Sequence, residues 1–291
     1  MSELAGVAAA LAGSVLGGSA LAGTRFAVGA LDPLAVVAVR YGIAALLLLP
    51  FIGPSLALLR RRADALPALG LAVLFFVIYP YTFALALAYT TAVRGSLALA
   101  SMPLLTLAFA VAIGREALQW RRVIGMLIAV AGLAFALSPR AGQAMPDAWR
   151  GDLTMVAAAA MQALYNVLSR PYIQRVGALP FTALGMALGG AALAAACLFL
   201  GSFHGMERLD TAGWAALVYL GVVGGAALWV LWSVGLRYAS ASLVALTTTM
   251  NALTACLLGV LFLGEPLGPE LVAGLVCVPL GIALATAGAR R

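Results

Sequence analysis

Charged residues in this sequence are confined to short breaks between long apolar stretches, and this pattern leaves few folds open. Hydrophobic residues make up 64% of the chain and charged residues 9%, whereas soluble domains contain about 25% charged residues. A helix of about 20 apolar residues is needed to cross the hydrocarbon core of a bilayer. The pattern therefore predicts an all-α integral membrane protein, with little sequence left for a soluble domain.

The breaks divide the chain into ten predicted membrane-spanning helices. We expect them near Leu4 to Arg25, Pro33 to Leu59, Pro67 to Tyr89, Ala92 to Ile113, Val123 to Leu137, Leu153 to Ser169, Phe181 to Leu200, Trp214 to Leu236, Leu243 to Leu263 and Leu271 to Ala287.

The second half of the chain repeats the first. Six residues recur 149 residues later, and the pattern Glu-x8-Gly-x6-Gly holds twice, at Glu116 and at Glu265. Five spans per copy is an odd number, so the second copy enters the membrane from the opposite side, as in many transporters. The sequence predicts two inverted five-helix repeats, residues 1–139 and 151–291, joined by an external linker, residues 140–150.

The positive charges predict the orientation of the chain. All seventeen basic residues are arginines, and more of them fall on one predicted side, including the run Arg60-Arg61-Arg62. The positive-inside rule then places both termini in the cytoplasm, so the net charge of +7 does not indicate nucleic-acid binding. Residues 1–3 contain no basic segment, and we expect the first helix to remain in the mature protein.

Small residues lie on one face of spans five and ten. Gly125 and Gly132 follow helical spacing in the first copy, as do Gly274 and Gly281 in the second. Such faces let membrane helices approach closely, so we expect these two spans to pack on each other or on a neighbour. A substrate path along them is disfavoured, because neither helix carries a polar residue near its middle.

Polar residues near the middle of spans six and nine are the strongest site candidates, because polar groups in hydrocarbon are costly without partners. Span six places Gln162, Tyr165 and Asn166 on one helical face. The alternative for this face is a hydrogen bond between helices. Span nine places Thr247 and Asn251 four residues apart.

The repeat connects these positions with spans one and four. Asn251 corresponds to Met102, which precedes Pro103, and Gln162 and Asn166 correspond to Gly13 and Gly17, beside Ser14. Pro103 lacks a backbone donor and suits a hinge or cavity wall. We therefore expect a cavity where the two repeats meet, with Gly17 and Pro103 in its wall.

Aromatic residues and one arginine complete the predicted site. Tyr79 and Tyr81 flank Pro80, and Trp229 is the repeat partner of Pro80. They are expected to line a pocket for the substrate side chain, although simple packing explains them equally well. Arg40 is the deepest charge and a candidate for a substrate carboxylate. Its alternative is to reach outward or to pair with Asp32.

Several residue types and motifs are absent from the predicted spans, and their absence excludes several function classes. Every Asp and Glu falls in a loop or at the end of a span, whereas an exporter of lipophilic cations normally uses a buried acid. There is no zinc-protease motif and no phosphate-binding loop, and His204 lies in a loop. The three cysteines fall inside predicted spans and imply no disulfide. We expect no enzymatic activity, no metal and no cofactor.

Several weak motifs occur in a specific order. Pro33-x6-Arg40-Tyr41, Pro103 and Gly114-Arg115-Glu116 lie in the first copy, and Gly151-Asp152, Gln162-Ala163-Leu164-Tyr165 and Gly264-Glu265-Pro266-Leu267 in the second. In this order they resemble a ten-span EamA-type carrier of the drug/metabolite transporter superfamily, and most closely the YddG-type amino-acid exporters. One departure is Gly17-Gly18-Ser19, where many members carry a tryptophan.

The resemblance implies alternating-access export of small metabolites. With it, the sequence predicts a multi-pass protein of a bacterial inner membrane that exports neutral or zwitterionic metabolites, most often amino acids including aromatic ones. We expect a small-molecule substrate and the lipid bilayer as partners, no nucleic acid, and a functional monomer. Two alternatives remain: a drug or cation exporter of the same fold, and a membrane receptor or scaffold that transports nothing.

Overall fold

The computed structural model describes residues 2–60, 62–141, 147–254, 257 and 268–287. Within these ranges every regular element is a helix. Eight of the helices are long and apolar enough to cross a membrane: Glu3–Ala27, Pro33–Phe51, Arg62–Tyr89, Arg94–Ala112, Trp120–Ser138, Ala178–Leu200, Thr211–Tyr238 and Pro269–Thr286. The chain therefore forms the predicted all-α bundle.

The elements follow one another in two similar series. The first comprises α1 (Glu3–Ala27), α2 (Pro33–Leu48), η1 (Leu49–Phe51), η2 (Gly53–Ser55), α3 (Leu56–Leu59), α4 (Arg62–Val73), η3 (Leu74–Ile78), α5 (Tyr79–Tyr89), α6 (Ala92–Leu99), α7 (Met102–Ala112) and α8 (Trp120–Ala141). The second comprises α9 (Ala148–Val176), α10 (Ala178–Leu200), η4 (Met206–Arg208), α11 (Thr211–Tyr219), η5 (Leu220–Ala227), α12 (Leu228–Tyr238), α13 (Ala241–Leu246) and α15 (Pro269–Thr286).

Three predicted spans differ from the observed helices. The second was expected to continue to Leu59, but α2 ends at Leu48 and short 3₁₀ turns follow, each with a proline in its first turn. The sixth is longer than expected, because α9 has 29 residues. Because α9 contains several polar residues, it is not among the eight helices that are apolar enough to cross a membrane. The ninth falls partly on residues 255–256 and 258–267, outside the described residues, so ten spans stay a prediction.

Irregular backbone occurs at repeat-related positions in the two series. The π-helical segments η3 and η5 interrupt the third and eighth predicted spans. The fourth span breaks into α6 and α7 at residues 100–101, and the ninth breaks after α13 at residues 247–248. Pro103 lies in the first turn of α7, where a missing N–H costs little. The break in the fourth span thus lies just before Pro103, the residue that was expected to form a hinge or a cavity wall.

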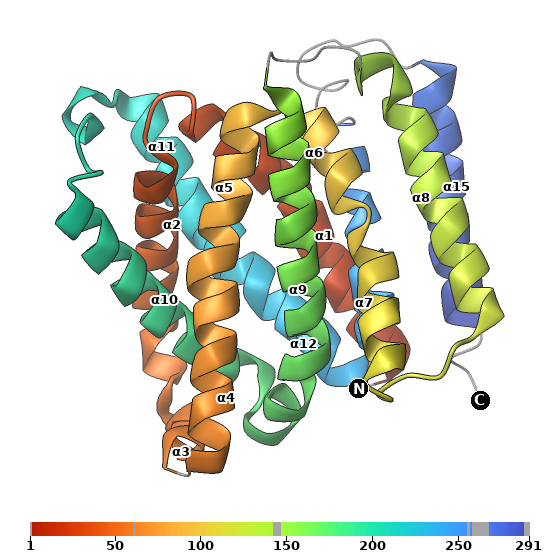
Figure 1. Ribbon diagram of the computed structural model, residues 1–291, viewed down its shortest axis with the longest axis horizontal. Helices are drawn as coiled ribbons and strands as arrows, with labels where there is room; N and C mark the ends of the chain where they lie inside the picture. The colour runs from red at the N-terminus through yellow and green to blue at the C-terminus, as the bar shows by residue number, and fades with distance from the viewer. Residues whose placement is uncertain (1, 61, 142–146, 255–256, 258–267, 288–291) are drawn as a thin grey trace.

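The two series interlock (Figure 1). Helix α1 packs against α12, and its counterpart α9 packs against α5, while α2 packs against α10. In Figure 1, α1 begins at the same end of the bundle at which α15 ends, whereas α9 begins at the opposite end. We call the former the terminal end and the latter the distal end.

Helices α8 and α15 form a separate pair at one side of the bundle (Figure 1). A Cβ built on Gly125 would lie 2.5 Å from the carbonyl oxygen of Gly281, and one on Gly132 would lie 2.4 Å from Cβ of Cys277. Only glycine permits such approaches. The prediction that spans five and ten pack on each other through small residues is therefore confirmed.

Polar contacts join the two series at both ends of the bundle. At the terminal end, Glu116 accepts hydrogen bonds from the backbone N–H (3.1 Å) and the hydroxyl of Ser242, and it pairs with Arg122. At the distal end, Asp152 accepts from Thr90 (2.8 Å) and pairs with Arg94.

A further ion pair at the terminal end links α9 to the start of α4. Arg175 donates to both carboxylate oxygens of Asp64, at 2.7 and 3.0 Å. These hydrogen bonds raise the pKa of Arg175.

The close packing of α8 on α15 predicts a stability defect from one added methyl group. In Gly281→Ala the new Cβ would lie 2.5 Å from the Gly125 carbonyl and 2.8 Å from the Ala129 amide. Overpacking of this kind costs about 1–3 kcal/mol, so we expect a lower melting temperature in detergent. Gly42→Ala is the matched control, since nothing lies within 4 Å of its Cβ. Equal melting temperatures for the two variants would contradict the packing argument.

Candidate functional site

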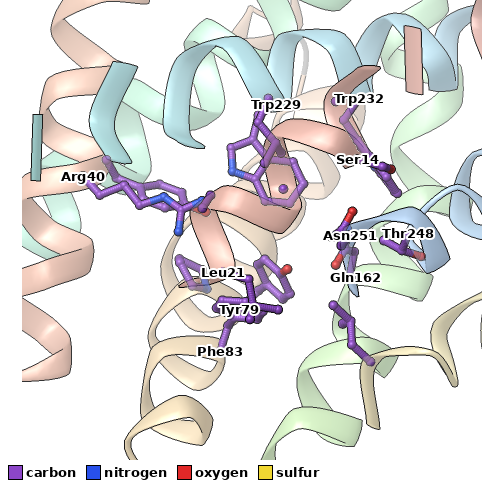
Figure 2. Close-up of a pocket in the computed structure, with 17 residues that line it drawn as sticks. Ser14, Leu21, Arg40, Tyr79, Phe83, Gln162, Trp229, Trp232, Thr248 and Asn251 are labelled. Atoms are coloured by element: carbon purple, nitrogen blue, oxygen red, sulfur yellow. The ribbon is translucent and has the colours of Figure 1, made fainter. Parts of the chain in front are cut away.

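A small cavity lies between the two series, near the middle of the bundle (Figure 2). Its volume is about 40 Å³, enough for a few water molecules. Eight of the predicted site residues line it: Ser14, Gly17, Arg40, Tyr79, Pro80, Gln162, Trp229 and Asn251. The walls come from α1, α2 and α5 of the first series and from α9, α12 and the ninth span of the second.

Arg40 forms one side of the cavity and is only 5% exposed. Its Nη1 donates to the Thr24 hydroxyl at 3.1 Å, and its Nη2 to the Gly224 carbonyl at 2.7 Å. Its Nε is buried and has no hydrogen-bond partner among the described residues. Arg40 therefore neither reaches outward nor pairs with Asp32, whose carboxylate instead accepts from the Leu34 N–H at the start of α2.

The π-helical segment η5 supplies the carbonyl that holds Arg40. In this winding, the N–H of Leu228 reaches back to the carbonyl of Val223, five residues earlier. The neighbouring Gly224 carbonyl accepts the guanidinium of Arg40. Gly225 keeps the backbones close, because a Cβ there would lie 2.9 Å from Cβ of Ala44. The irregular helix thus fixes the charged group at the edge of the cavity.

Two amide side chains form the opposite side of the cavity. Figure 2 shows Asn251 and Gln162 across from Arg40, with Trp229 and Tyr79 between. Asn251 Oδ1 and Gln162 Oε1 are buried without a hydrogen-bond partner among the described residues. Asn251 occupies the space beside Gly17, where a Cβ would lie 2.9 Å from its amide nitrogen.

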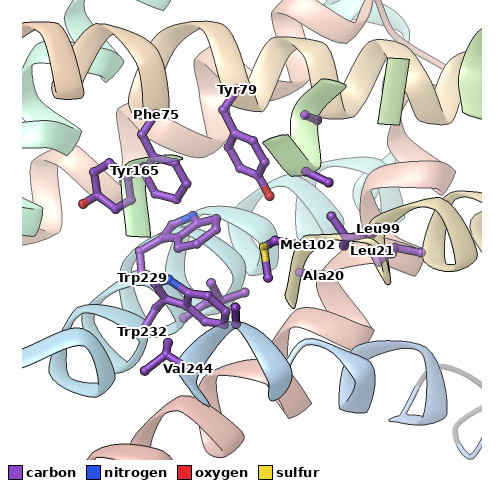
Figure 3. Close-up of a cluster of buried hydrophobic side chains, with 14 of the residues drawn as sticks. Ala20, Leu21, Phe75, Tyr79, Leu99, Met102, Tyr165, Trp229, Trp232 and Val244 are labelled. Carbon is purple, nitrogen blue, oxygen red and sulfur yellow. The ribbon is translucent and has the colours of Figure 1, made fainter. Parts of the chain in front are cut away.

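Aromatic rings form the wall between these two sides (Figure 3). Phe75 stacks between Tyr79 and Tyr165, with ring centroids 4.9 and 3.7 Å away. Trp229 meets Phe75 edge-on at 4.8 Å, and its indole Nε1 has no hydrogen-bond partner among the described residues. Phe75 itself lies in η3, so the first π-helical segment positions the aromatic wall as η5 positions Arg40.

The structure places the other predicted site residues outside the cavity lining. Asn166 is fully buried and its Oδ1 accepts from Trp232 Nε1 at 3.0 Å, which is the helix–helix bond given as the alternative. Thr247 forms a hydrogen bond with the cavity residue Ser14, with the two hydroxyl oxygens 2.9 Å apart. Tyr165 lies behind Phe75. Tyr81 is 39% exposed and Pro103 is buried in α7, and neither lines the cavity.

The sequence argument missed several lining residues, including Tyr41, Phe83 and Thr248. Phe83 lies four residues after Tyr79, so helical spacing was a sufficient signal for it. Thr248 is exposed to the cavity by the break in the ninth span, which the sequence does not reveal.

The chemistry of the cavity is that of a binding site. No carboxylate lines it, and the described residues contain no group of three potential metal ligands. Donors lie on one side, at Arg40 and Trp229, and amide oxygens on the other. Buried polar atoms normally have partners, so these atoms are available to a ligand.

Known proteins share the organisation of this chain. A family model described as EamA-like transporter family matches twice, over residues 4–138 and 149–287. Uncharacterized protein PA1977 of Pseudomonas aeruginosa is 33% identical over 88% of this chain and 84% of its own. Uncharacterized transporter YyaM of Bacillus subtilis is 24% identical over 94% of this chain and 90% of its own.

A solved crystal structure has the same fold. It matches with a TM-score of 0.80 over 100% of this chain and 99% of its own, at 23% identity. The two matched segments of the family model span both series of helices, which supports a duplicated architecture.

Asn166 and Asn251 should respond differently to substitution. Asn166→Ala leaves the buried Trp232 Nε1 without its acceptor, which costs about 1–3 kcal/mol, whereas Asn251→Ala removes an oxygen that has no partner among the described residues. We expect thermal unfolding in detergent to show a lower melting temperature for Asn166→Ala only. Adding Trp232→Phe should recover part of that loss in a double-mutant cycle. Equal destabilisation by both alanine variants would contradict this assignment.

Proposed function

The chain belongs to the EamA-like transporter family, and on that premise we propose that it carries small zwitterionic metabolites, including aromatic amino acids, by alternating access. Membership makes it a multi-pass membrane transporter of small molecules rather than an enzyme. The proposal concerns the substrate and the way in which it is moved.

One observation carries the choice of substrate: four buried polar atoms without a partner among the described residues lie at the cavity between the repeats. They are Arg40 Nε, Trp229 Nε1, Gln162 Oε1 and Asn251 Oδ1. An unpaired buried polar atom costs about 1–3 kcal/mol, which a ligand with matching groups recovers. A protein whose helices only packed together, as in a receptor or scaffold, has no evident need for such a set.

The two sides match the two charged groups of an amino acid. A carboxylate fits the guanidinium and indole donors of Arg40 and Trp229, because Arg forms fork-shaped pairs with carboxylates. An ammonium fits the amide oxygens of Gln162 and Asn251. The rings of Tyr79 and Trp229 offer an apolar surface to a side chain. A lipophilic cation finds no carboxylate in this lining, which disfavours a drug or cation exporter.

The size of the cavity supports a mechanism in which the walls separate. Pockets for small ligands usually measure about 300–1,000 Å³, whereas this cavity has about 40 Å³. Polar contacts between the series hold both ends, through Glu116 and Ser242 at one and Asp152 and Thr90 at the other. We propose that these two sets open alternately, and that the breaks at residues 100–101 and 247–248 accommodate the motion.

We propose that transport is outward, as the resemblance to EamA-type exporters implies, and that the predicted topology assigns the two ends of the bundle to the two sides of the membrane. We propose that the second repeat is inverted, because α1 and α9 begin at opposite ends of the bundle (Figure 1). The terminal end is assigned to the cytoplasm of a bacterial inner membrane by the positive-inside rule, and export to the outer side. A single chain supplies both repeats around the cavity, so a monomer suffices.

Counterflow in liposomes tests the proposal. We expect the purified protein to exchange labelled phenylalanine, threonine or methionine. Gln162→Ala and Asn251→Ala should each reduce the rate about three- to tenfold, the equivalent of one net hydrogen bond. Tyr81→Phe, at an exposed ring outside the cavity, should leave the rate unchanged.

Three outcomes would favour another function. Absence of flux across a broad metabolite panel would indicate a receptor or scaffold. Flux of lipophilic cations that depends on a pH gradient, without amino-acid flux, would indicate a drug exporter. Full activity in both amide variants would remove these residues from the site.

A further inference from the structure

We infer that this site requires the carboxylate of its substrate but not the ammonium, so that 2-oxo and 2-hydroxy acids are ligands alongside the corresponding amino acids. The inference rests on the proposed function and specifies the substrate class of the same cavity. It follows from an asymmetry between the two sides of the cavity: one carries a fixed charge, whereas the other is neutral and can adapt.

The fixed side is Arg40. Its guanidinium is held in place from two directions, by Thr24 on α1 and by the Gly224 carbonyl in η5. Those bonds use two of its five N–H donors, and Nε remains buried without a partner among the described residues. A charge at 5% exposure with no carboxylate in the lining is costly unless an anion joins it. This side therefore selects strongly for a carboxylate.

The adaptable side consists of Gln162 and Asn251. Each amide carries one acceptor and two donor hydrogens, and rotation by half a turn exchanges them. The carbonyl oxygens can accept from an ammonium or a hydroxyl, and the NH₂ groups can donate to a hydroxyl or an oxo group. Because neither amide is charged, loss of the ammonium leaves no unpaired ion behind. This side therefore discriminates weakly among the groups that a 2-substituted acid presents.

The hollows at the terminal end are also expected to favour anions over cations. Two of them, of about 360 and 170 Å³, both border Arg115 and Pro171. Arg170 borders the second, two turns of α9 from Gln162. The one carboxylate there, Glu116, already accepts from Ser242 and pairs with Arg122. Hollows lined by arginine in this way concentrate anions rather than cations.

The first test compares four compounds that share one side chain, on the wild-type protein in liposomes. Phenylpyruvate, phenyllactate, phenethylamine and phenylalanine methyl ester are measured as inhibitors of phenylalanine counterflow. We expect the two acids to inhibit within about tenfold of unlabelled phenylalanine, and the amine and the ester to be at least about a hundredfold weaker, since they lack the charged partner of Arg40.

The second test places a fixed negative charge on the adaptable side. Asn251→Asp changes the amide to a carboxylate of the same shape. It should keep phenylalanine as a ligand, weaken phenylpyruvate at least about tenfold, and strengthen phenethylamine, because the ammonium gains an ionic partner. Gln162→Glu provides the same change on α9 in case the first variant does not fold. Tyr81→Phe is the control and should retain the wild-type order of inhibitors.

The outcomes separate the inference from the proposed function. Phenylalanine flux that is inhibited by phenethylamine but not by phenylpyruvate would overturn the inference and leave the proposed function intact. Absence of amino-acid flux would overturn the proposed function, and thermal stabilisation of the purified protein by the same compounds then tests the inference directly. Stabilisation by the two acids and not by the amine supports it; equal or reversed stabilisation would overturn it.

Discussion

The structure depends on one constraint of the bilayer: a backbone N–H or carbonyl cannot be left unpaired in hydrocarbon. Irregular backbone is therefore tolerated only where protein surrounds it. The four interruptions, η3, η5 and the breaks at residues 100–101 and 247–248, fall at repeat-related positions in the two series. Each supplies or adjoins residues at the central cavity, among them Tyr79, Leu99 and Thr248. The irregular segments of the helices thus lie at the cavity that forms the candidate binding site.

Arg40 shows how such a departure stabilises a buried charge. A guanidinium at this depth needs acceptors, and a helix carbonyl can serve because its oxygen has two lone pairs and can accept a second hydrogen bond. The π-helical winding of η5 brings the Gly224 carbonyl to Arg40 at 2.7 Å, and Thr24 supplies a second acceptor. These two bonds hold the cation without neutralising it. The charge remains available at the cavity, which an ion pair with an acidic residue would have prevented.

Periodicity and polarity predicted the all-α bundle, and eight of the residues named from the sequence line the candidate cavity. Small residues at helical spacing correctly placed α8 against α15, since hydrocarbon gives close packing few other means. Gln162 and Asn251 were identified because they are polar in apolar helices. The same signal named Asn166 with two readings, because polarity does not reveal which partner satisfies a side chain. Trp232 is that partner. Nor does the sequence reveal the π-helical segments, since their residues are those of ordinary apolar helices.

The two halves of the chain present different groups at equivalent positions near the cavity. Gly17 lies against Asn251, whose amide nitrogen would be 2.9 Å from a Cβ at that glycine, and their repeat counterparts, Asn166 and Met102, also lie in contact. Each pair has one asparagine, but in the first pair it belongs to the broken ninth span and reaches the cavity, whereas in the second it belongs to the unbroken α9 and is taken by Trp232. The two asparagines thus differ in role because their surroundings differ: Asn166 holds α9 against α12, and Asn251 stands at the cavity.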